Sequence, residues 1–123
     1  MSIYAPIEKF LTVVIEEYQM EARRVGNIAA EGCSLAPYNL KVLIASNARA
    51  QGALEVQTLI RQTVAYSNTE GVATETAERE ALPRIVRALG SKLDFYLQNE
   101  ETHIGTLKVI NDVLISLQIQ SQN

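Results

Sequence analysis

The stretch from Pro37 to Tyr66 constrains the fold more than any other part of the chain, because we expect all of it to form one helix. Pro37 supplies the φ angle that suits a first helical turn. Inside the stretch, residues 44 to 53 are mostly small and run Ile-Ala-Ser-Asn-Ala-Arg-Ala-Gln-Gly-Ala. Small side chains let two helix backbones come close together, and Gly52 would cost an exposed helix roughly 1 kcal/mol relative to alanine. We therefore predict that this helix packs closely against another helix.

Another helix should precede this stretch, from Pro6 to about Ala30. Its buried stripe would consist of apolar residues spaced alternately by four and three positions with one interruption, namely Ile7, Leu11, Val14, Tyr18, Val25 and Ile28. Gly32 can adopt the left-handed backbone conformation that closes a helix, which predicts a stop there. Because the connection to the next helix is short, we expect the two helices to be antiparallel neighbours.

A third helix is predicted to start at Thr74, after the turn at residues 68 to 71. Glu75 and Arg79 are four residues apart, which favours an ion pair worth about 0.3 kcal/mol on a helix surface. Pro83 lacks a backbone donor and disfavours helical geometry at the residue before it. We therefore expect either a kink, or a short helix followed by a longer one, near residues 80 to 83.

The last third of the chain allows two alternatives. Apolar residues from Leu82 to Leu117 keep one helical phase, which would suit a single very long helix. A turn at residues 99 to 102 would instead fold the last segment back as a fourth helix, and Gly105 weakens a continuous helix. We favour the turn because it gives every apolar stripe a partner. The predicted fold is all-α, an antiparallel four-helix bundle in a single domain over residues 1–123; the alternative is a three-helix arrangement with one very long C-terminal helix.

Composition and charge argue against several kinds of partner. The chain carries 11 basic and 14 acidic residues for a net charge of −3, and its longest basic run is the pair Arg23-Arg24. The electrostatic footprint of a nucleic-acid-binding protein is therefore missing. No segment approaches the roughly 18 to 20 apolar residues that span a bilayer, and the amino terminus does not resemble a signal peptide. We expect a cytoplasmic protein without a nucleic-acid or membrane partner.

The residues that could carry chemistry are scattered. Glu100 and His103 have the spacing with which di-iron bundles hold metal, but the motif occurs once and His103 is the single histidine. Cys33, the single cysteine, lies in a predicted loop without a nearby base, which indicates a passive thiol. The sequence contains no glycine-rich phosphate loop and no cysteine pair. We therefore predict no enzymatic activity, no cofactor and no metal.

Polar residues on the helix from 37 to 66 disagree with a simple surface helix, because they share faces with apolar groups. One interpretation is that they are ordinary solvent-side residues. The other is that the helix is contacted on both sides, by its own bundle and by a second subunit or partner, with Arg49 and Arg61 binding carboxylates there. The residues predicted to take part in such an interaction are Asn47, Arg49, Gly52 and Arg61.

Asn39-Leu40 and the run from 43 to 53 contain leucines, the pair Asn47-Ala48 and several further alanines. In these features residues 39–53 resemble the hairpin tip of the bacterial chemoreceptor (methyl-accepting chemotaxis protein) signalling domains, where a leucine-rich turn leads into an asparagine-alanine pair and an alanine-rich helix. The segment from Leu54 to Thr58 departs from that pattern, which normally contains glycine. The resemblance implies a long antiparallel helical hairpin that dimerises and docks a histidine kinase with its coupling protein.

The favoured function is a non-enzymatic helical protein-interaction module in bacterial signalling or assembly, which associates as a homodimer through the helix 37–66. An alternative from a different class is a bundle that binds a small apolar molecule between its helices. That alternative requires a cavity lined by four aromatic residues, Phe10, Tyr18, Phe95 and Tyr96.

Overall fold

Four helices form the chain in the computed structural model, which describes residues 2–32, 36–68, 74–98 and 100–122, without the side chains of 100–103 and 119–122. The helices are α1 (Ala5–Ala30), α2 (Pro37–Asn68), α3 (Thr74–Leu97) and α4 (Glu100–Gln122). No strand occurs in these ranges. The predicted all-α four-helix bundle is confirmed. The alternative with one very long C-terminal helix is wrong, because the helical path is interrupted between Leu97 and Glu100.

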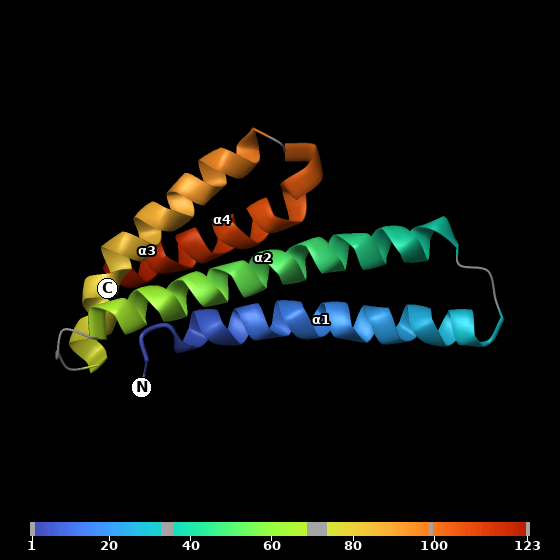
Figure 1. Cartoon of the computed structure of the whole chain (residues 1–123), viewed down its shortest axis with the longest axis horizontal. Coiled ribbons are helices and arrows are strands. Elements are labelled where there is room, and N and C mark those ends of the chain that lie inside the picture. The colour runs from blue at the N-terminus through green and yellow to red at the C-terminus, as the bar shows by residue number, and fades with distance from the viewer. Residues whose placement is uncertain (1, 33–35, 69–73, 99, 123) are drawn as a thin grey trace.

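The helices are arranged as two antiparallel hairpins (Figure 1). Helices α1 and α2 form the longer hairpin, and α3 and α4 form a shorter one that packs against α2. Helix α2 contacts each of the other three helices. The end of the α1–α2 hairpin near its connection extends past the α3–α4 hairpin, so the first half of α2 has fewer neighbours than the second half (Figure 1).

The helix starts predicted at Pro6, Pro37 and Thr74 agree closely with the observed ones, whereas the turn predicted at residues 99 to 102 comes earlier, because α4 already begins at Glu100. Pro6 lies in the first turn of α1, and α2 begins at Pro37. Gly32 has a φ angle of +79°, the left-handed conformation that closes a helix and that a side chain would strain. Helix α3 begins at Thr74, as expected from the turn signal before it.

The core lies where all four helices meet, in the first half of α1 and the second half of α2. Its fully buried members come from every helix: Tyr4, Ile7, Leu11, Val14, Ala53, Val56, Ile60, Ala81, Ile85, Leu89, Val109, Ile110, Val113 and Leu117. Burying one such Leu, Ile or Val side chain stabilises a fold by about 1.5–3 kcal/mol. The four-residue and three-residue spacing predicted for α1 therefore does identify its buried face at Ile7, Leu11 and Val14.

Helix α3 continues through Pro83 without interruption, so the predicted break into two helices does not occur. The first turns of α3 run at an angle to the rest of the helix (Figure 1), which fits the missing backbone donor at Pro83. The predicted ion pair on its surface is present, with Arg79 Nη2 lying 3.0 Å from Glu75 Oε1.

None of the four described helices combines the length and the apolar composition that a membrane span requires.

The residues just before and at the start of α1 are tied to α3 through Glu78. The Tyr4 hydroxyl donates a hydrogen bond to the Glu78 carbonyl oxygen at 2.6 Å, and the Ile3 amide donates to the Glu78 carboxylate at 2.7 Å. Burial of Tyr4, together with the negative charge of Glu78, raises the pKa of the tyrosine to about 12. This buried polar contact holds the N-terminal segment against the core.

Candidate functional site

Helices α2 and α4 cross with almost no side-chain volume between them. A Cβ atom added to Gly52 of α2 would lie 2.9 Å from Thr106 Cα, and one added to Gly105 of α4 would lie 2.8 Å from Ala48 Cβ. Favourable contacts between carbon atoms are about 3.5–4.0 Å, so neither position accepts even alanine without a shift. The Thr106 hydroxyl also donates to the Ala48 carbonyl oxygen at 3.4 Å. The close packing expected at Gly52 is therefore made inside the chain, against α4.

Both arginines predicted for the interaction site meet carboxylates of α1. Arg49 Nη1 lies 3.3 Å from Glu17 Oε2, and Arg61 Nη2 lies 3.0 Å from Glu8 Oε2. The two arginine side chains are 38% and 67% exposed, so each pair contributes at most about 1 kcal/mol. The pairs join α1 to α2, and most of the Arg61 side chain is still in contact with solvent.

The fourth predicted residue, Asn47, belongs to a strip of α2 that faces away from the other helices. We call this strip the α2 ridge; it consists of Leu40, Ile44, Asn47, Gln51, Leu54 and Thr58. Its members are spaced alternately by four and three residues, so they lie along one face of the helix. The three large apolar members are 42%, 68% and 51% exposed in chain order, while Asn47 is half-buried. The ridge thus presents apolar surface that the other described helices leave partly uncovered.

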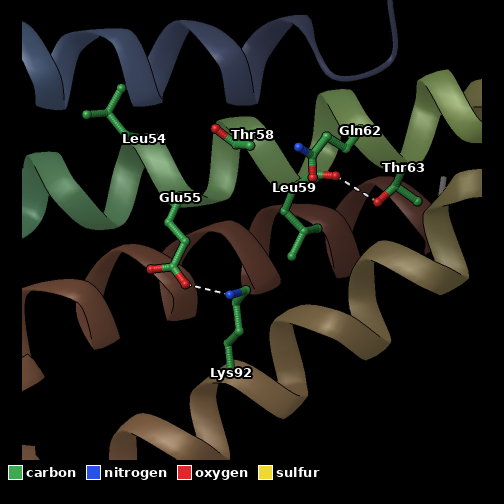
Figure 2. A pocket seen from close by; sticks show the side chains of 7 residues that line it. All are labelled: Leu54, Glu55, Thr58, Leu59, Gln62, Thr63 and Lys92. Atoms are coloured by element: carbon green, nitrogen blue, oxygen red, sulfur yellow. Dashed lines mark hydrogen bonds and ion pairs between the residues drawn. The ribbon is translucent and has the colours of Figure 1, made fainter.

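An open groove of about 370 Å³ adjoins the second half of the ridge and is shown in Figure 2. It is lined by Leu54, Glu55, Thr58, Leu59, Gln62, Thr63 and Lys92. Glu55 and Leu59 point from α2 toward α3, and Lys92 points back from α3 to Glu55 (Figure 2). We call it the α2–α3 groove.

The charged groups of the α2–α3 groove satisfy one another. The Glu55 carboxylate accepts a hydrogen bond from Lys92 Nζ at 2.5 Å, and the Tyr96 hydroxyl lies 2.9 Å from both carboxylate oxygens. Burial, and then the hydrogen bond to Glu55, raise the pKa of Tyr96. The cluster connects α2 to α3 and leaves no unpaired charge on Glu55 or Lys92, so we interpret it as a structural contact.

A second open groove, of about 300 Å³, lies where the start of α4 meets the first half of α2. We call it the α2–α4 groove; it is lined by Lys41, Ile44, Ala45, Ala48, Arg49, Ile104, Gly105 and Lys108. Three of these residues are cationic, and none is acidic. Lys41 and Lys108 are exposed and have no ion-pair partner among the described residues. Basic and apolar groups are therefore concentrated here in a chain whose net charge is negative.

Metal-ligating side chains do not cluster in the part of the chain that the structure describes. Among those residues no group of three or more His, Cys, Asp or Glu side chains could hold a metal ion. Cys33 and the side chains of Glu100 and His103 lie outside the described residues, so the interpretations of these three stay predictions.

The four aromatic residues named for an apolar ligand site lie on two helices. Phe10 and Tyr18 are half-buried on α1, and Phe95 and Tyr96 are on α3. Phe95 is 62% exposed and meets Tyr96 edge to face, with ring centroids 5.4 Å apart and an angle of 73° between the rings. Phe95 therefore faces solvent and does not line an interior cavity.

The α2–α4 groove includes residues that the sequence analysis did not single out, namely Lys41, Ile104 and Lys108. One signal was present: positions 41, 44, 45 and 48 have the spacing of a single helix face. The contribution of α4 could not be read in the same way, because it depends on which face of α4 meets α2.

Comparison of the chain with protein-family models, with curated proteins and with solved structures yields no match.

Proposed function

We propose that this protein is a non-enzymatic helical interaction module that associates with a second copy of itself through α2. The observation that carries the proposal is the α2 ridge. Its alternating four-residue and three-residue spacing is the pattern with which two helices pack side by side, and Leu40, Ile44 and Leu54 would supply the apolar contacts. The proposed contact uses the ridge and leaves Gly52 in its place against α4.

The polar members of the ridge fit a contact that specifies its partner. Asn47 and Gln51 interrupt the apolar series at its centre. A polar residue at such a position selects register and number of chains at some loss of stability. The ridge would therefore form a moderately stable dimer in which only one alignment of the two helices satisfies both amide side chains.

A role in bacterial signalling or assembly belongs to the same proposal. Residues 39 to 53, which resemble the tip of a chemoreceptor hairpin, occupy the first half of α2 beside the connection of the α1–α2 hairpin. That resemblance is the support for a signalling role.

The oligomeric state tests the proposal directly. Sedimentation equilibrium over a range of concentrations should give the mass of a dimer for the wild-type chain. The Leu54→Glu variant should give the monomer, because the charge would lie inside the proposed contact. Met20→Glu is the matched control, since Met20 is 66% exposed on α1, away from the ridge. A wild-type chain that is still monomeric at about 1 mM would refute the proposal.

A further inference from the structure

The α2–α4 groove combines two features that select a ligand. Ile44 of α2 and Ile104 of α4 are 68% and 51% exposed, so the groove offers apolar contact from both helices. Lys41 and Lys108 add a positive charge from each helix and have no ion-pair partner among the described residues. A ligand that fits must carry an apolar group with negative charges on either side of it.

From this combination we propose that the α2–α4 groove binds an acidic amphipathic helix of a partner protein, with an apolar side chain between Ile44 and Ile104 and carboxylates at Lys41 and Lys108. The inference rests on the proposed function, in that it takes the chain to be an interaction module, and it adds the chemistry of a partner. The contact is a helix lying in a groove between two helices, with anchors on one face of the bound helix.

The shape of the groove favours a helix over an enclosed small molecule. Sites for small molecules bury most of the ligand surface in a cleft of about 300–1,000 Å³. The α2–α4 groove is at the lower end of that range, with about 300 Å³, and it is open to solvent along its length. Ala45, Ala48 and Gly105 place little side-chain volume in the groove, which leaves room for the side chains of a helix that lies along the surface.

Charge decides between a second copy and an acidic partner at this groove. If two copies met groove to groove, Lys41, Arg49 and Lys108 of one copy would face the same cations of the other, and that repulsion disfavours the contact. An acidic segment would instead gain two charge pairs with cations that are otherwise unpaired. Ile44 belongs to both the groove and the α2 ridge, so a bound acidic helix would compete with the proposed dimer.

Binding of synthetic peptides tests this inference. The probe is a fluorescein-labelled amphipathic peptide of about 15 residues, or roughly four helical turns, built from Leu, Ala and Glu. The matched probe has Gln in place of every Glu. Fluorescence anisotropy should show that the wild-type chain binds the acidic peptide. The Gln peptide should bind at least about tenfold more weakly. Raising the salt concentration from about 0.05 M to about 0.5 M should weaken binding of the acidic peptide.

Charge reversal assigns the binding to the groove. The Lys41→Glu/Lys108→Glu double variant should bind the acidic peptide at least about tenfold more weakly than wild type. Lys9→Glu/Arg87→Glu makes the same change in net charge at exposed residues that do not line the groove, and it should bind as wild type does. Circular dichroism of both variants verifies that they are folded. Equal binding of the two peptides, or equal loss in both double variants, would overturn the proposal.

The peptide-binding test and the test of self-association can fail independently of each other. Leu54 does not line the α2–α4 groove, so the Leu54→Glu variant should bind the acidic peptide at least as tightly as wild type even when it is monomeric. A monomeric wild-type chain that binds the peptide would refute the dimer and support the groove. A wild-type chain that dimerises but does not bind the peptide would support the dimer and overturn the proposal for the groove. Octanoate is a small molecule with an apolar chain and one carboxylate. If the chain binds octanoate saturably but does not bind the peptide, the assignment of a helical partner is overturned.

Discussion

Four helical glycines offer a direct test of the contact between α2 and α4. Gly52 and Gly105 lie at the crossing of these helices, whereas Gly26 and Gly90 have no heavy atom within 4 Å of the position where a Cβ would be added. All four can be replaced by alanine, and the backbone benefit of that change is similar inside any helix. Differences in the free energy of unfolding among the four alanine variants therefore report how much free space surrounds each position.

The expected magnitudes follow from two opposing effects. Replacing glycine by alanine inside a helix stabilises it by about 0.5–1 kcal/mol, and this should be the whole effect at Gly26 and Gly90. At Gly105 the new methyl group would lie 2.8 Å from Ala48 Cβ and 3.1 Å from the Arg49 amide nitrogen. Forcing extra volume into a packed contact costs typically 1–3 kcal/mol. Because the backbone benefit is the same at both positions, we expect Gly105→Ala to be less stable than Gly90→Ala by roughly 1–3 kcal/mol.

Urea denaturation followed by far-UV circular dichroism measures these differences as free energies of unfolding. Gly52→Ala should fall on the destabilised side too, because its nearest atom is the backbone Cα of Thr106, which cannot move without the helix. A change in the midpoint at constant slope would show that stability itself has changed. If Gly52→Ala and Gly105→Ala both stabilise the protein as much as Gly90→Ala does, the two helices are not in close contact and the reasoning fails.

Two further predictions concern polar contacts. Folding raises the pKa of Tyr4 from 10.0 to about 12. Between these pH values the unfolded chain loses the tyrosine proton while the folded chain keeps it. The free energy of unfolding should therefore be unaffected by the ionisation of Tyr4 below pH 10 and decline by up to roughly 2–3 kcal/mol as the pH rises to about 12. Unfolding of Tyr4→Phe should depend less on pH in this window, and an identical dependence in both proteins would contradict the role of Tyr4. Lys92→Met removes one partner of Glu55 while the Tyr96 hydroxyl still donates to it. Because the Lys92 and Glu55 side chains are 34% and 32% exposed, the change should lower the free energy of unfolding by less than about 1 kcal/mol, measured by thermal or urea denaturation. A decrease above about 2 kcal/mol would mean that the pair is effectively buried.

The helix boundaries could be predicted because each one depends on a local signal. Pro37 starts α2 and Gly32 follows α1 with a positive φ angle, and both effects act within a few residues of the chain. The buried stripe of α1 was equally accessible, since a helix with one covered face shows a clear period in its apolar residues. The break between α3 and α4 was less evident, because apolar residues keep their phase across it.

The candidate site depended on contacts that no local pattern reveals. Helix α2 is contacted by α1, α3 and α4, so apolar residues occur around most of it, and its periodicity cannot distinguish a covered face from an exposed one. Ile44 and Leu54 are exposed while Ala53 and Val56 are fully buried, although all four are apolar. The importance of Gly52 could be recognised from its cost in a helix, but its contact with α4 could not.

The sequence by itself determined that this protein consists of helices, where most of them begin and end, and that one of them must pack closely along a run of small residues. Tertiary structure alone decided that Gly52 meets Thr106, that Arg49 and Arg61 bind carboxylates of α1, and that Lys41 and Lys108 flank one groove. Helix formation depends on residues within one or two turns, which adjacent sequence specifies. A groove between two helices depends on how they are rotated and aligned against each other, and that is settled only when all four helices bury their apolar faces together.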